Sequence, residues 1–482
     1  MSLAYNLKLI GLNKILRTIA SVARYGYTLL ALLDSATNSG NNAAIEDEHE
    51  KVSYHDLHKQ ALQLAYFLNN KYQIKSGCKI AIVGNNSVAL VRALFAVSGL
   101  GADVYLLNPN QRKNYFDSAV SQNKISHIIS DPALCAELSF YNIPVYSLAE
   151  TIITTPALSL PNVVQRKRGS VIILSSGSTG EPKPEKRNVS ATSFLDPLVD
   201  IIDKLHLKEN SSVLISVPLF HGYGLAALLL SVFLQQKIYL TDKFNTEKTL
   251  KILADNTDCW IAVPLMIRKV QESKGFQLLK VKNIISGGDT LPPDLVKLIH
   301  DTTSARLYNM YGTSETGVCT IATHNDLLRY PDTIGRLIKG SEARLSYREK
   351  ISFDSIGEIS IRCGWSADKR RNEFVSTGDL VSQNEEGYYF FKGRRDDLII
   401  IGGENVYPIE LETVLYRHPN VKWVKVKAVM DEHQSMQIHL EIVLKTDLVL
   451  NELQKWIDEN VPKYMVPRHI TVLDQEPNSK LM

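Results

Sequence analysis

The sequence predicts an α/β fold: a large N-terminal domain of doubly wound sheets with a small β-barrel-like part, followed by a small α+β domain. The first half alternates short β-branched runs with helical segments, which is typical of a parallel sheet covered by helices. From about Gly335 the pattern changes to short alternating strands, such as 357–362 and 387–391. After the charged stretch 393–397 helices and strands mix again, and 482 residues exceed what one hydrophobic core supports.

The elements of the first half follow one another as strand, helix and strand. Ser53 is a suitable cap for the first long helix. Several strands end in polar, glycine-containing segments, and ligands bind beyond the carboxyl ends of parallel strands, so we expect these segments to meet in one cleft. The expected strands are 43–45, 52–54, 79–84, 103–107, 127–130, 171–174, 212–217, 237–240, 260–263, 283–286 and 306–308. The expected helices are 55–71, 87–99, 115–122, 225–235, 246–254 and 293–302.

A serine- and glycine-rich segment follows the strand at 171–174. Gly177 and Gly180 allow the backbone to curl so that successive N–H groups face one concavity, which suits an anion. Hydroxyl groups and a lysine accompany them: Ser175, Ser176, Ser178, Thr179 and Lys183. This composition favours a phosphate-binding loop, with a flexible polar turn as the alternative. It does not fit the loop of P-loop NTPases, because Lys183 comes three residues after Gly180 and no hydroxyl follows it.

Composition and charge argue against several classes of protein. A formal net charge of +3 gives no basis for nucleic-acid binding, which needs a concentrated basic patch. The five cysteines are scattered and never spaced as C-x-x-C, so we expect neither a disulfide framework nor a zinc site, and a cytoplasmic location fits best. No uninterrupted apolar run reaches the roughly 18 residues of a membrane-spanning helix, so we expect a soluble protein.

Residues 2–33 carry apolar side chains at near-helical spacing with basic side chains between them. Basic amphipathic helices can lie on anionic membrane surfaces, so a peripheral membrane contact through this segment is one interpretation. The alternative is a helix packed on the first domain, because packing stabilises most helices. The apolar residues are Leu7, Ile10, Leu12, Ile15, Leu16, Ile19, Val22 and Ala23, and the basic ones are Lys8, Lys14, Arg17 and Arg24.

Taken together, these segments resemble a known family. Residues 174–183 resemble the glycine-rich signature of the adenylate-forming (ANL) enzymes, the superfamily of acyl-CoA synthetases, adenylation domains and luciferases. The likeness extends from about residue 43 to the end, and it is most similar to the fatty-acyl and medium-chain acyl-CoA synthetases. The family's further motifs follow in the same order at 218–225, 286–291, 309–315, 377–379, 393–397 and 402–408.

The resemblance implies a two-step reaction. A carboxylate attacks the α-phosphorus of ATP to give acyl-AMP and pyrophosphate, and the thiol of coenzyme A then displaces AMP. We therefore expect an AMP-forming acid–thiol ligase of fatty acid metabolism, acting on a medium- or long-chain fatty acid with ATP, Mg²⁺ and coenzyme A. Two alternatives stay open: loading of an acyl carrier protein, or a weakly active nucleotide-binding relative with a regulatory role.

The resemblance also implies residues for the triphosphate and the base. The glycine-rich loop binds pyrophosphate. Tyr311 and Gly312 form a wall against adenine, Thr313 belongs to the same nucleotide-binding segment, and Ser314 lies where the family has a threonine at the α-phosphate. Glu315 is expected to hold Mg²⁺, because a hard carboxylate suits a hard cation.

Further implied residues serve the ribose, the acyl group and the carboxylate. Asp379 would accept hydrogen bonds from the ribose hydroxyls, with Arg394 assisting. His221 would lie at the mouth of the acyl pocket. Lys480 is the best candidate for the family's catalytic C-terminal lysine, although Ser479 replaces the usual glycine and no arginine follows.

The resemblance divides the chain into three parts. Residues 1–42 are an N-terminal amphipathic extension, 43–395 the AMP-binding domain, and 396–482 the small domain. The hinge between the two domains is expected at Asp396, and the glycines at 402–403 are expected to line the pantetheine tunnel.

Overall fold

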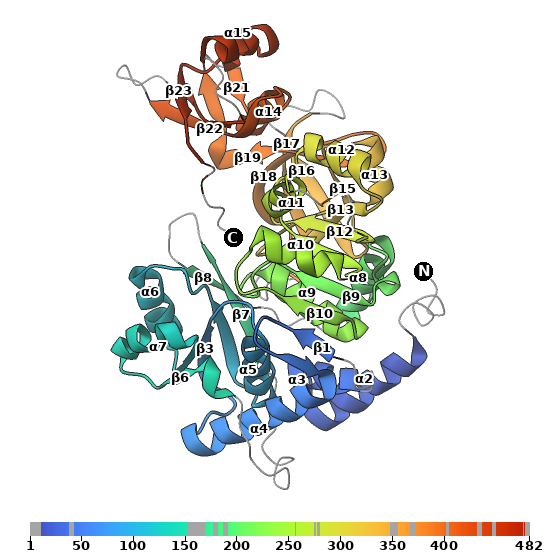
Figure 1. The fold of residues 1–482 in the computed structure, drawn as a ribbon, viewed down its shortest axis with the longest axis vertical. Helices are drawn as coiled ribbons and strands as arrows, with labels where there is room; N and C mark the ends of the chain where they lie inside the picture. The colour runs from blue at the N-terminus through green and yellow to red at the C-terminus, as the bar shows by residue number, and fades with distance from the viewer. Residues whose placement is uncertain are drawn as a thin grey trace.

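The computed structural model contains two large sheets with their helices, and a smaller region at one end with a three-stranded and a two-stranded sheet (Figure 1). This agrees with the predicted fold class. The structure describes residues 11–37, 43–151, 169–176, 182–186, 191–255, 257–273, 276, 280–347, 355–366, 373–401, 404–430, 436–445, 450–475 and 477.

The first sheet has six strands in the order β6-β5-β3-β4-β7-β8, all parallel except the antiparallel last pair. Its strands are β3 (Lys79–Val83), β4 (Asp103–Leu107), β5 (His127–Ser130), β6 (Val145–Ser147), β7 (Val171–Ser176) and β8 (Pro182–Lys186). Its helices are α5 (Val88–Gly99), α6 (Lys113–Asn123) and α7 (Pro132–Leu138). Every residue of α5 except Ala89 is buried, which explains its nearly continuous apolar sequence.

The second sheet is the scaffold of most of the molecule. It has thirteen strands in the order β16-β17-β18-β19-β15-β14-β13-β12-β11-β9-β10-β1-β2, parallel from β13 to β1 and antiparallel elsewhere. The central strands are β9 (Ser212–Ile215), β10 (Lys237–Leu240), β11 (Cys259–Ala262), β12 (Asn283–Gly287), β13 (Arg306–Thr313) and β14 (Gly317–Ala322). The outer strands are β1 (Ala43–Glu46), β2 (Lys51–Ser53), β15 (Thr333–Leu337), β16 (Ser341–Ser346), β17 (Gly357–Cys363), β18 (Val375–Gln383) and β19 (Tyr389–Arg394).

Helices flank this sheet and begin where the sequence supplies caps. The Ser53 side chain accepts a hydrogen bond from the Asp56 amide at 3.0 Å, so the expected cap is present. The helices are α3 (Leu29–Ala36), α4 (Tyr54–Tyr72), α8 (Ala191–Lys204), α9 (Gly222–Leu234), α10 (Thr246–Ala254), α11 (Pro264–Gln271), α12 (Pro293–Thr302) and α13 (His324–Arg329).

Two elements differ from the sequence-based expectation. Strand β13 was expected to end at Tyr308 but continues to Thr313, because antiparallel pairing with β14 extends it. Helix α9 was expected to begin at Leu225 but begins at Gly222, and the Leu225 amide already bonds the His221 carbonyl at 3.0 Å. Both differences fall on segments that the resemblance assigns to the active site.

The small domain has its own hydrophobic core, formed by residues from Ile399 to Met465. Its β22 pairs with β23, which pairs with β24 in parallel. The elements are β20 (Ile399–Ile401), β21 (Glu404–Val406), α14 (Pro408–Leu415), β22 (Val421–Met430), β23 (Met436–Leu444), α15 (Leu450–Asn460) and β24 (His469–Val472). The separate core agrees with a small second domain, while the boundary at 395/396 stays a prediction.

The small domain contacts the large one through α11. The Arg268 guanidinium carbon lies 5.5 Å from the centre of the Tyr416 ring, and Lys422 Nζ lies 3.7 Å from Glu272 Oε2. Arg268 is held in place by a 2.7 Å ion pair with Asp294 on α12.

The N-terminal segment forms two helices where one helical pattern was expected over 2–33. Helix α2 (Leu12–Tyr25) is followed after a short turn by α3, whose Leu30 and Leu33 are fully buried in the large-domain core. None of the helices in the described ranges is both long enough and apolar enough to cross a bilayer.

Candidate active site

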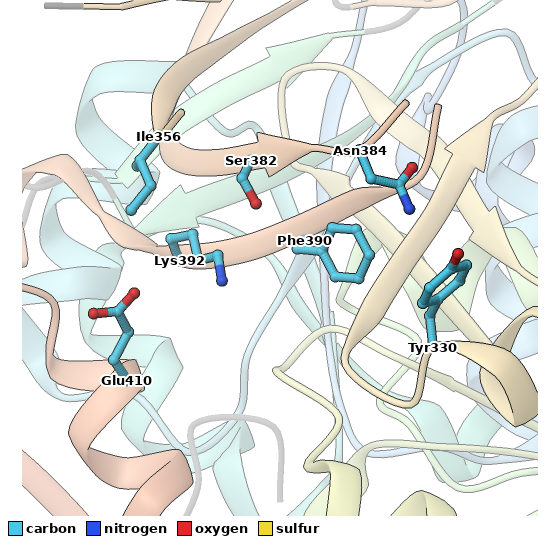
Figure 2. Close-up of a pocket in the computed structure, with 7 residues that line it drawn as sticks. All are labelled: Tyr330, Ile356, Ser382, Asn384, Phe390, Lys392 and Glu410. Atoms are coloured by element: carbon cyan, nitrogen blue, oxygen red, sulfur yellow. The ribbon is translucent and has the colours of Figure 1, made fainter. Parts of the chain in front are cut away.

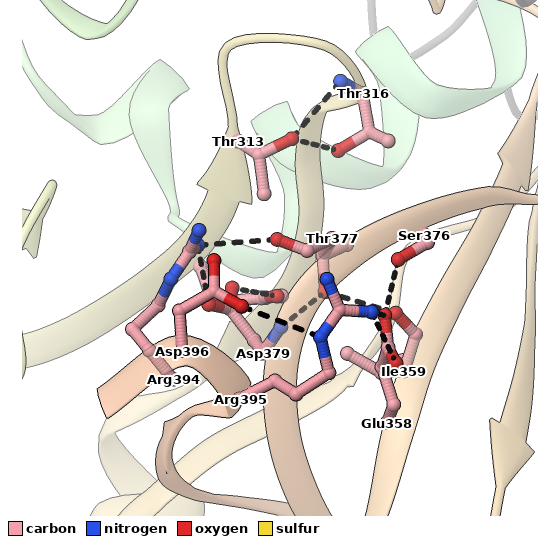
Figure 3. Close-up of polar contacts among 11 residues, drawn as sticks. Thr313, Thr316, Glu358, Ile359, Ser376, Thr377, Asp379, Arg394, Arg395 and Asp396 are labelled. Atoms are coloured by element: carbon pink, nitrogen blue, oxygen red, sulfur yellow. Dashed lines mark hydrogen bonds and ion pairs between the residues drawn. The ribbon is translucent and has the colours of Figure 1, made fainter. Parts of the chain in front are cut away.

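Three side chains that the resemblance assigns to the ribose and adenine sites, from β13, β18 and β19, are joined by hydrogen bonds. Figure 3 shows Asp379 and Arg394 of this cluster. The Tyr311 hydroxyl donates to Asp379 Oδ2 at 2.6 Å, and Arg394 Nη1 donates to Asp379 Oδ1 at 2.7 Å. Asp379 and Arg394 are direct partners across the β18–β19 ladder, so the sheet register fixes their approach. The carboxylate is only 4% exposed, which makes these charge-assisted bonds strong.

The backbone around Asp379 is fixed by the preceding threonine. The Thr377 hydroxyl donates to the Ile359 carbonyl at 2.9 Å and accepts from the Asp379 amide at 3.1 Å. The Thr377 carbonyl accepts a further bond from Arg394 Nη1 at 3.1 Å. Gly378, between the two, has φ of +72°, a left-handed conformation that favours glycine. The Thr377-Gly378-Asp379 sequence is therefore required by the geometry as well as by the chemistry.

The electrostatics of this cluster keep a proton on Tyr311. Burial, followed by the Asp379 charge, raises the pKa of Tyr311 well above its usual range. Burial also raises the pKa of Asp379, against the lowering effects of Tyr311 and Arg394, and the nearby Glu315 carboxylate raises it further. The site therefore contains a buried carboxylate, whose ionised form is costly in free energy, together with the two side chains that donate hydrogen bonds to it.

The other nucleotide-binding candidates, residues 312–315, lie at the tip of the β13–β14 hairpin. A β-carbon at Gly312 would lie 2.1 Å from the Gly317 carbonyl oxygen, so only glycine allows the two strands to approach this closely. The hydroxyls of Thr313 and Thr316 are 3.0 Å apart, and the Thr316 amide donates to Thr313 Oγ1 at 3.2 Å. This turn sets Ser314 at the surface and Glu315 half-buried.

Thr316 is a residue that the sequence reasoning missed. It is fully buried, and its hydroxyl also lies 3.0 Å from Cys319 Sγ. The only sequence signal is its place directly after the Tyr311–Glu315 motif, where a buried hydroxyl would have to bond the turn itself.

The described residues do not form a complete metal cage. They hold no group of three or more histidine, cysteine, aspartate or glutamate side chains that could bind an ion. Glu315 lies close enough to Asp379 to raise its pKa, so the two carboxylates concentrate negative charge on one side of the site. A Mg²⁺ ion that keeps waters and phosphate oxygens as ligands needs only one such carboxylate from the protein.

His221 precedes the first turn of α9, at the junction of the two large sheets. Asn86, which follows β3, accepts from the Leu219 amide at 2.8 Å and donates to the Val217 carbonyl at 3.0 Å. A β-carbon at Gly224 would lie 2.2 Å from the Pro218 carbonyl oxygen, so this loop is tightly folded. Asn86 is a second residue that sequence reasoning missed, because its partners belong to a distant strand.

Contacts around α9 reach two strands, β7 and β12. Ile173 Cδ1 of β7 lies 4.0 Å from the place that a β-carbon would take at Gly222. The Tyr223 hydroxyl donates to the Ile285 carbonyl of β12 at 2.9 Å, and its ring lies 3.2 Å from the place of a β-carbon at Gly287. Helix α9 therefore packs against β7 and β12, and the convergence of the polar strand ends on one cleft stays a prediction.

Several predicted site residues cannot be placed. Gly177, Ser178, Thr179, Gly180 and Lys480 lie outside the described residues, as do the glycines at 402–403. For Ser175, Ser176 and Lys183 the structure describes the strand, β7 or β8, and nothing of the side chain. Their roles stay predictions.

A separate cavity of about 430 Å³ lies between the β18–β19 pair and α14 (Figure 2). Lys392 and Glu410 face it from the two domains, with Tyr330 and Phe390 on one side. None of the predicted site residues lines it. We therefore place the candidate active site at the Tyr311–Asp379–Arg394 cluster and not in this cavity.

Comparison with protein families decides the class. Residues 32–365 match the family described as AMP-binding enzyme, and residues 410–480 match the AMP-binding enzyme C-terminal domain. The chain belongs to the AMP-binding enzyme family. The expectation of an AMP-forming enzyme of the adenylate-forming superfamily is thereby confirmed.

Relatives and solved structures agree along almost the whole chain. The 2-succinylbenzoate–CoA ligase of Bacillus cereus is 26% identical over 470 residues, covering 93% of this chain and 95% of the relative, and that of Oceanobacillus iheyensis is 26% identical with 93% and 96% covered. The anthranilate CoA ligase solved with anthranoyl-AMP matches with a TM-score of 0.84 at 18% identity, covering 95% of both chains. The o-succinylbenzoate CoA synthetase of Bacillus subtilis, solved with its acyl-adenylate, gives 0.80 at 22% identity, with 93% and 95% covered.

These relatives are acid–CoA ligases, in line with the expected acid–thiol ligase class. Their acid, however, is 2-succinylbenzoate and not a fatty acid. The expectation of fatty acid metabolism finds no support among them. That expectation rested on an overall likeness to the fatty-acyl and medium-chain synthetases. The apolar residues after His221 add nothing to it, because Leu225, Ala227 and Leu228 of α9 belong to the core.

Proposed function

We propose that this protein is an ATP-dependent acid–CoA ligase that activates a carboxylic acid as acyl-AMP and then transfers the acyl group to coenzyme A. The observation that carries the proposal is the buried Asp379 carboxylate with Tyr311 and Arg394 bonded to its two oxygens. An acceptor-only group with lone pairs to spare suits a ribose, which presents two hydroxyl donors. Family membership and the CoA-ligase relatives support the same reaction.

The residue roles follow from the same arrangement. The Tyr311 ring would stack on adenine while its hydroxyl holds Asp379. Ser314 would donate a hydrogen bond to the α-phosphate. Glu315 would hold Mg²⁺, whose charge offsets the negative charges of the acid's carboxylate and of the triphosphate as they approach each other. A Bacillus subtilis relative has been solved with ATP and magnesium ion, which supports these ligands. The loop around Gly177–Gly180, with Lys183, would bind pyrophosphate, and Lys480 would contact the carboxylate during adenylation.

As the acid substrate we propose an aromatic carboxylate of the 2-succinylbenzoate type in preference to a fatty acid. The relatives that match over 93% of this chain act on that acid according to their names. His221 and Tyr223 stand at the start of α9, where the resemblance places the acyl group, and the Tyr223 ring against Gly287 narrows that region. We expect a compact planar acid to fit beside the Tyr223 ring better than a long flexible acyl chain.

The test is ATP–pyrophosphate exchange, measured separately with 2-succinylbenzoate, benzoate, anthranilate, octanoate and palmitate. We expect exchange to be fastest with an aromatic acid, and addition of coenzyme A to convert that acid into its thioester. Fastest exchange with a fatty acid would overturn the assignment of an aromatic substrate, but the proposal of an acid–CoA ligase would stand. Exchange without thioester formation would point to a carrier protein as the acceptor, and no exchange with any acid would overturn the enzyme proposal.

A further inference from the structure

Helix α2 is attached to the large domain in an unusual orientation. Figure 1 shows it at the lower edge of the domain, extending away from the sheets. A packed helix normally turns its apolar side toward the protein and its polar side toward water. Helix α2 departs from this pattern, because it also turns large apolar side chains toward water.

The outward side of α2 is apolar. Leu12, Leu16 and Ile19 are 57%, 55% and 60% exposed, and their spacing of four and three residues places them on one face. Ala23 continues the same face and is also exposed, and Tyr27, just beyond the helix, is 66% exposed. We call Leu12, Leu16, Ile19 and Ala23 the apolar stripe.

The inward side of α2 is mixed: Val22 and Tyr25 pack on the large-domain core, and polar contacts lie beside them. The Ser21 hydroxyl donates to Asp34 Oδ2 of α3 at 2.6 Å, and Lys14 Nζ lies 5.5 Å from the centre of the Phe233 ring. Burial, followed by the charge of Lys208, lowers the pKa of Lys14 to about 8. Tyr25 packs edge-on against His58 at 5.5 Å. These contacts fix which way the helix faces, so the apolar stripe cannot turn inward without breaking them.

The charges beside the apolar stripe are all positive. Helix α2 has no acidic side chain, Arg17 is exposed, and the Arg24 side chain is 68% exposed. An exposed apolar face with basic residues along its edge is typical of helices that lie in the headgroup region of an anionic bilayer. An exposed tyrosine such as Tyr27 suits that same depth.

We propose that the apolar stripe of α2, with Arg17 and Arg24 beside it, docks this enzyme reversibly on an anionic lipid surface. A second copy of the chain fits less well, because two copies of α2 would bring basic residues together with no acidic side chain in the helix to meet them. This proposal does not depend on the acid that the enzyme activates.

The test is co-sedimentation of the full-length protein with vesicles, at low salt, of pure phosphatidylcholine and of phosphatidylcholine with 30% phosphatidylglycerol (about one lipid in three charged). We expect binding to the anionic vesicles only, reduced at least fivefold by Leu16→Gln/Ile19→Gln and weakened by Arg17→Gln or by added salt. Leu328→Gln is the matched control, because Leu328 is 45% exposed on α13, and it should bind as the wild type does. The unfolding midpoint and pyrophosphate exchange of each variant check that the fold is retained.

Three results would overturn the proposal. Equal binding to neutral and anionic vesicles would remove the role of the charges. Loss of binding in Leu328→Gln as large as in the double variant would show that the effect is not specific to α2. A dimer in light scattering that dissociates in Leu16→Gln/Ile19→Gln, without vesicle binding by the wild type, would assign the stripe to a second copy of the chain.

Discussion

Asp379 is the residue on which the site depends, and its burial has opposite effects on stability and on binding. Because the pKa of Asp379 is raised in the folded protein, the fold favours the protonated form. The ionised carboxylate therefore costs stability at neutral pH. Its two lone-pair-rich oxygens are nevertheless what a ribose requires.

Asp379→Asn is expected to weaken ATP binding by about tenfold or more, since a charge-assisted hydrogen bond is worth about 1.5–3 kcal/mol. The same variant should be as stable as the wild type, or more stable, at neutral pH. As pH falls from neutral toward the usual aspartate pKa of 3.8, the wild type should gain stability relative to the variant, because the folded state takes up its proton first. Calorimetric titration with ATP and unfolding midpoints across this pH range measure both effects.

Tyr311→Phe separates the two functions of the tyrosine. It keeps the ring for adenine and removes the hydroxyl that bonds Asp379 at 2.6 Å, so ATP binding should weaken less than in Asp379→Asn. Unchanged ATP affinity in Asp379→Asn would contradict the assigned ribose contact.

Sequence reasoning found these residues but not how they interact. Tyr311, Asp379 and Arg394 could be named because they stand in motifs that follow the family's order. The bond from Tyr311 to Asp379 joins residues 68 positions apart, on strands β13 and β18, which three other strands separate in the sheet order. Thr316 was missed for the same reason: its importance comes from burial, which the sequence does not display.

At the scale of elements, the start of α9 is sensitive to added side-chain volume. A β-carbon at Gly224 would lie 2.2 Å from the Pro218 carbonyl oxygen, whereas one at Gly222 would meet only Ile173 Cδ1 at 4.0 Å. Two glycines of the same turn thus differ sharply in the space beside them.

Gly224→Ala should therefore lower the unfolding midpoint, at a cost of about 1–3 kcal/mol for forcing the loop apart, and should slow pyrophosphate exchange. Gly222→Ala is the matched control and should leave both nearly unchanged. Scanning calorimetry of the two variants side by side makes the comparison. Equal destabilisation by both would show that the contact with Pro218 does not hold the loop.

Most elements could be predicted from periodicity and caps, and two strands show what these signals leave out. The segment after Tyr308 has the composition of a loop, yet pairing with β14 keeps it extended to Thr313. The sheet of the first strand could not be predicted either: β1 lies beside β10 near the edge of the second sheet. In both cases the partner strand decides, and a single sequence does not reveal it.

At the scale of the whole molecule, one of the contacts between the two domains is an exposed ion pair. Lys422 and Glu272 are 3.7 Å apart and each more than a third exposed, so their attraction is worth about 1 kcal/mol or less. A contact this weak suits a small domain that turns at Asp396 between the two half-reactions, as the resemblance implies.

Lys422→Glu should shift the balance between domain orientations, because it replaces attraction by repulsion. We expect adenylation and thioester formation from supplied acyl-AMP to change by different factors, with their ratio altered about two- to fivefold. The double reversal Lys422→Glu/Glu272→Lys should restore the ratio. An equal change in both half-reactions would argue that this contact does not distinguish the orientations.

The most direct measurement is pyrophosphate exchange with the preferred acid in the wild type and in Asp379→Asn, followed by mass detection of the acyl-AMP and its chase with coenzyme A. The wild type should exchange, accumulate the acyl-adenylate and convert it to the thioester, and Asp379→Asn should need at least tenfold more ATP for the same exchange. A wild type that forms no acyl-adenylate with any acid, or an Asp379→Asn variant with unaltered ATP dependence, would contradict the account.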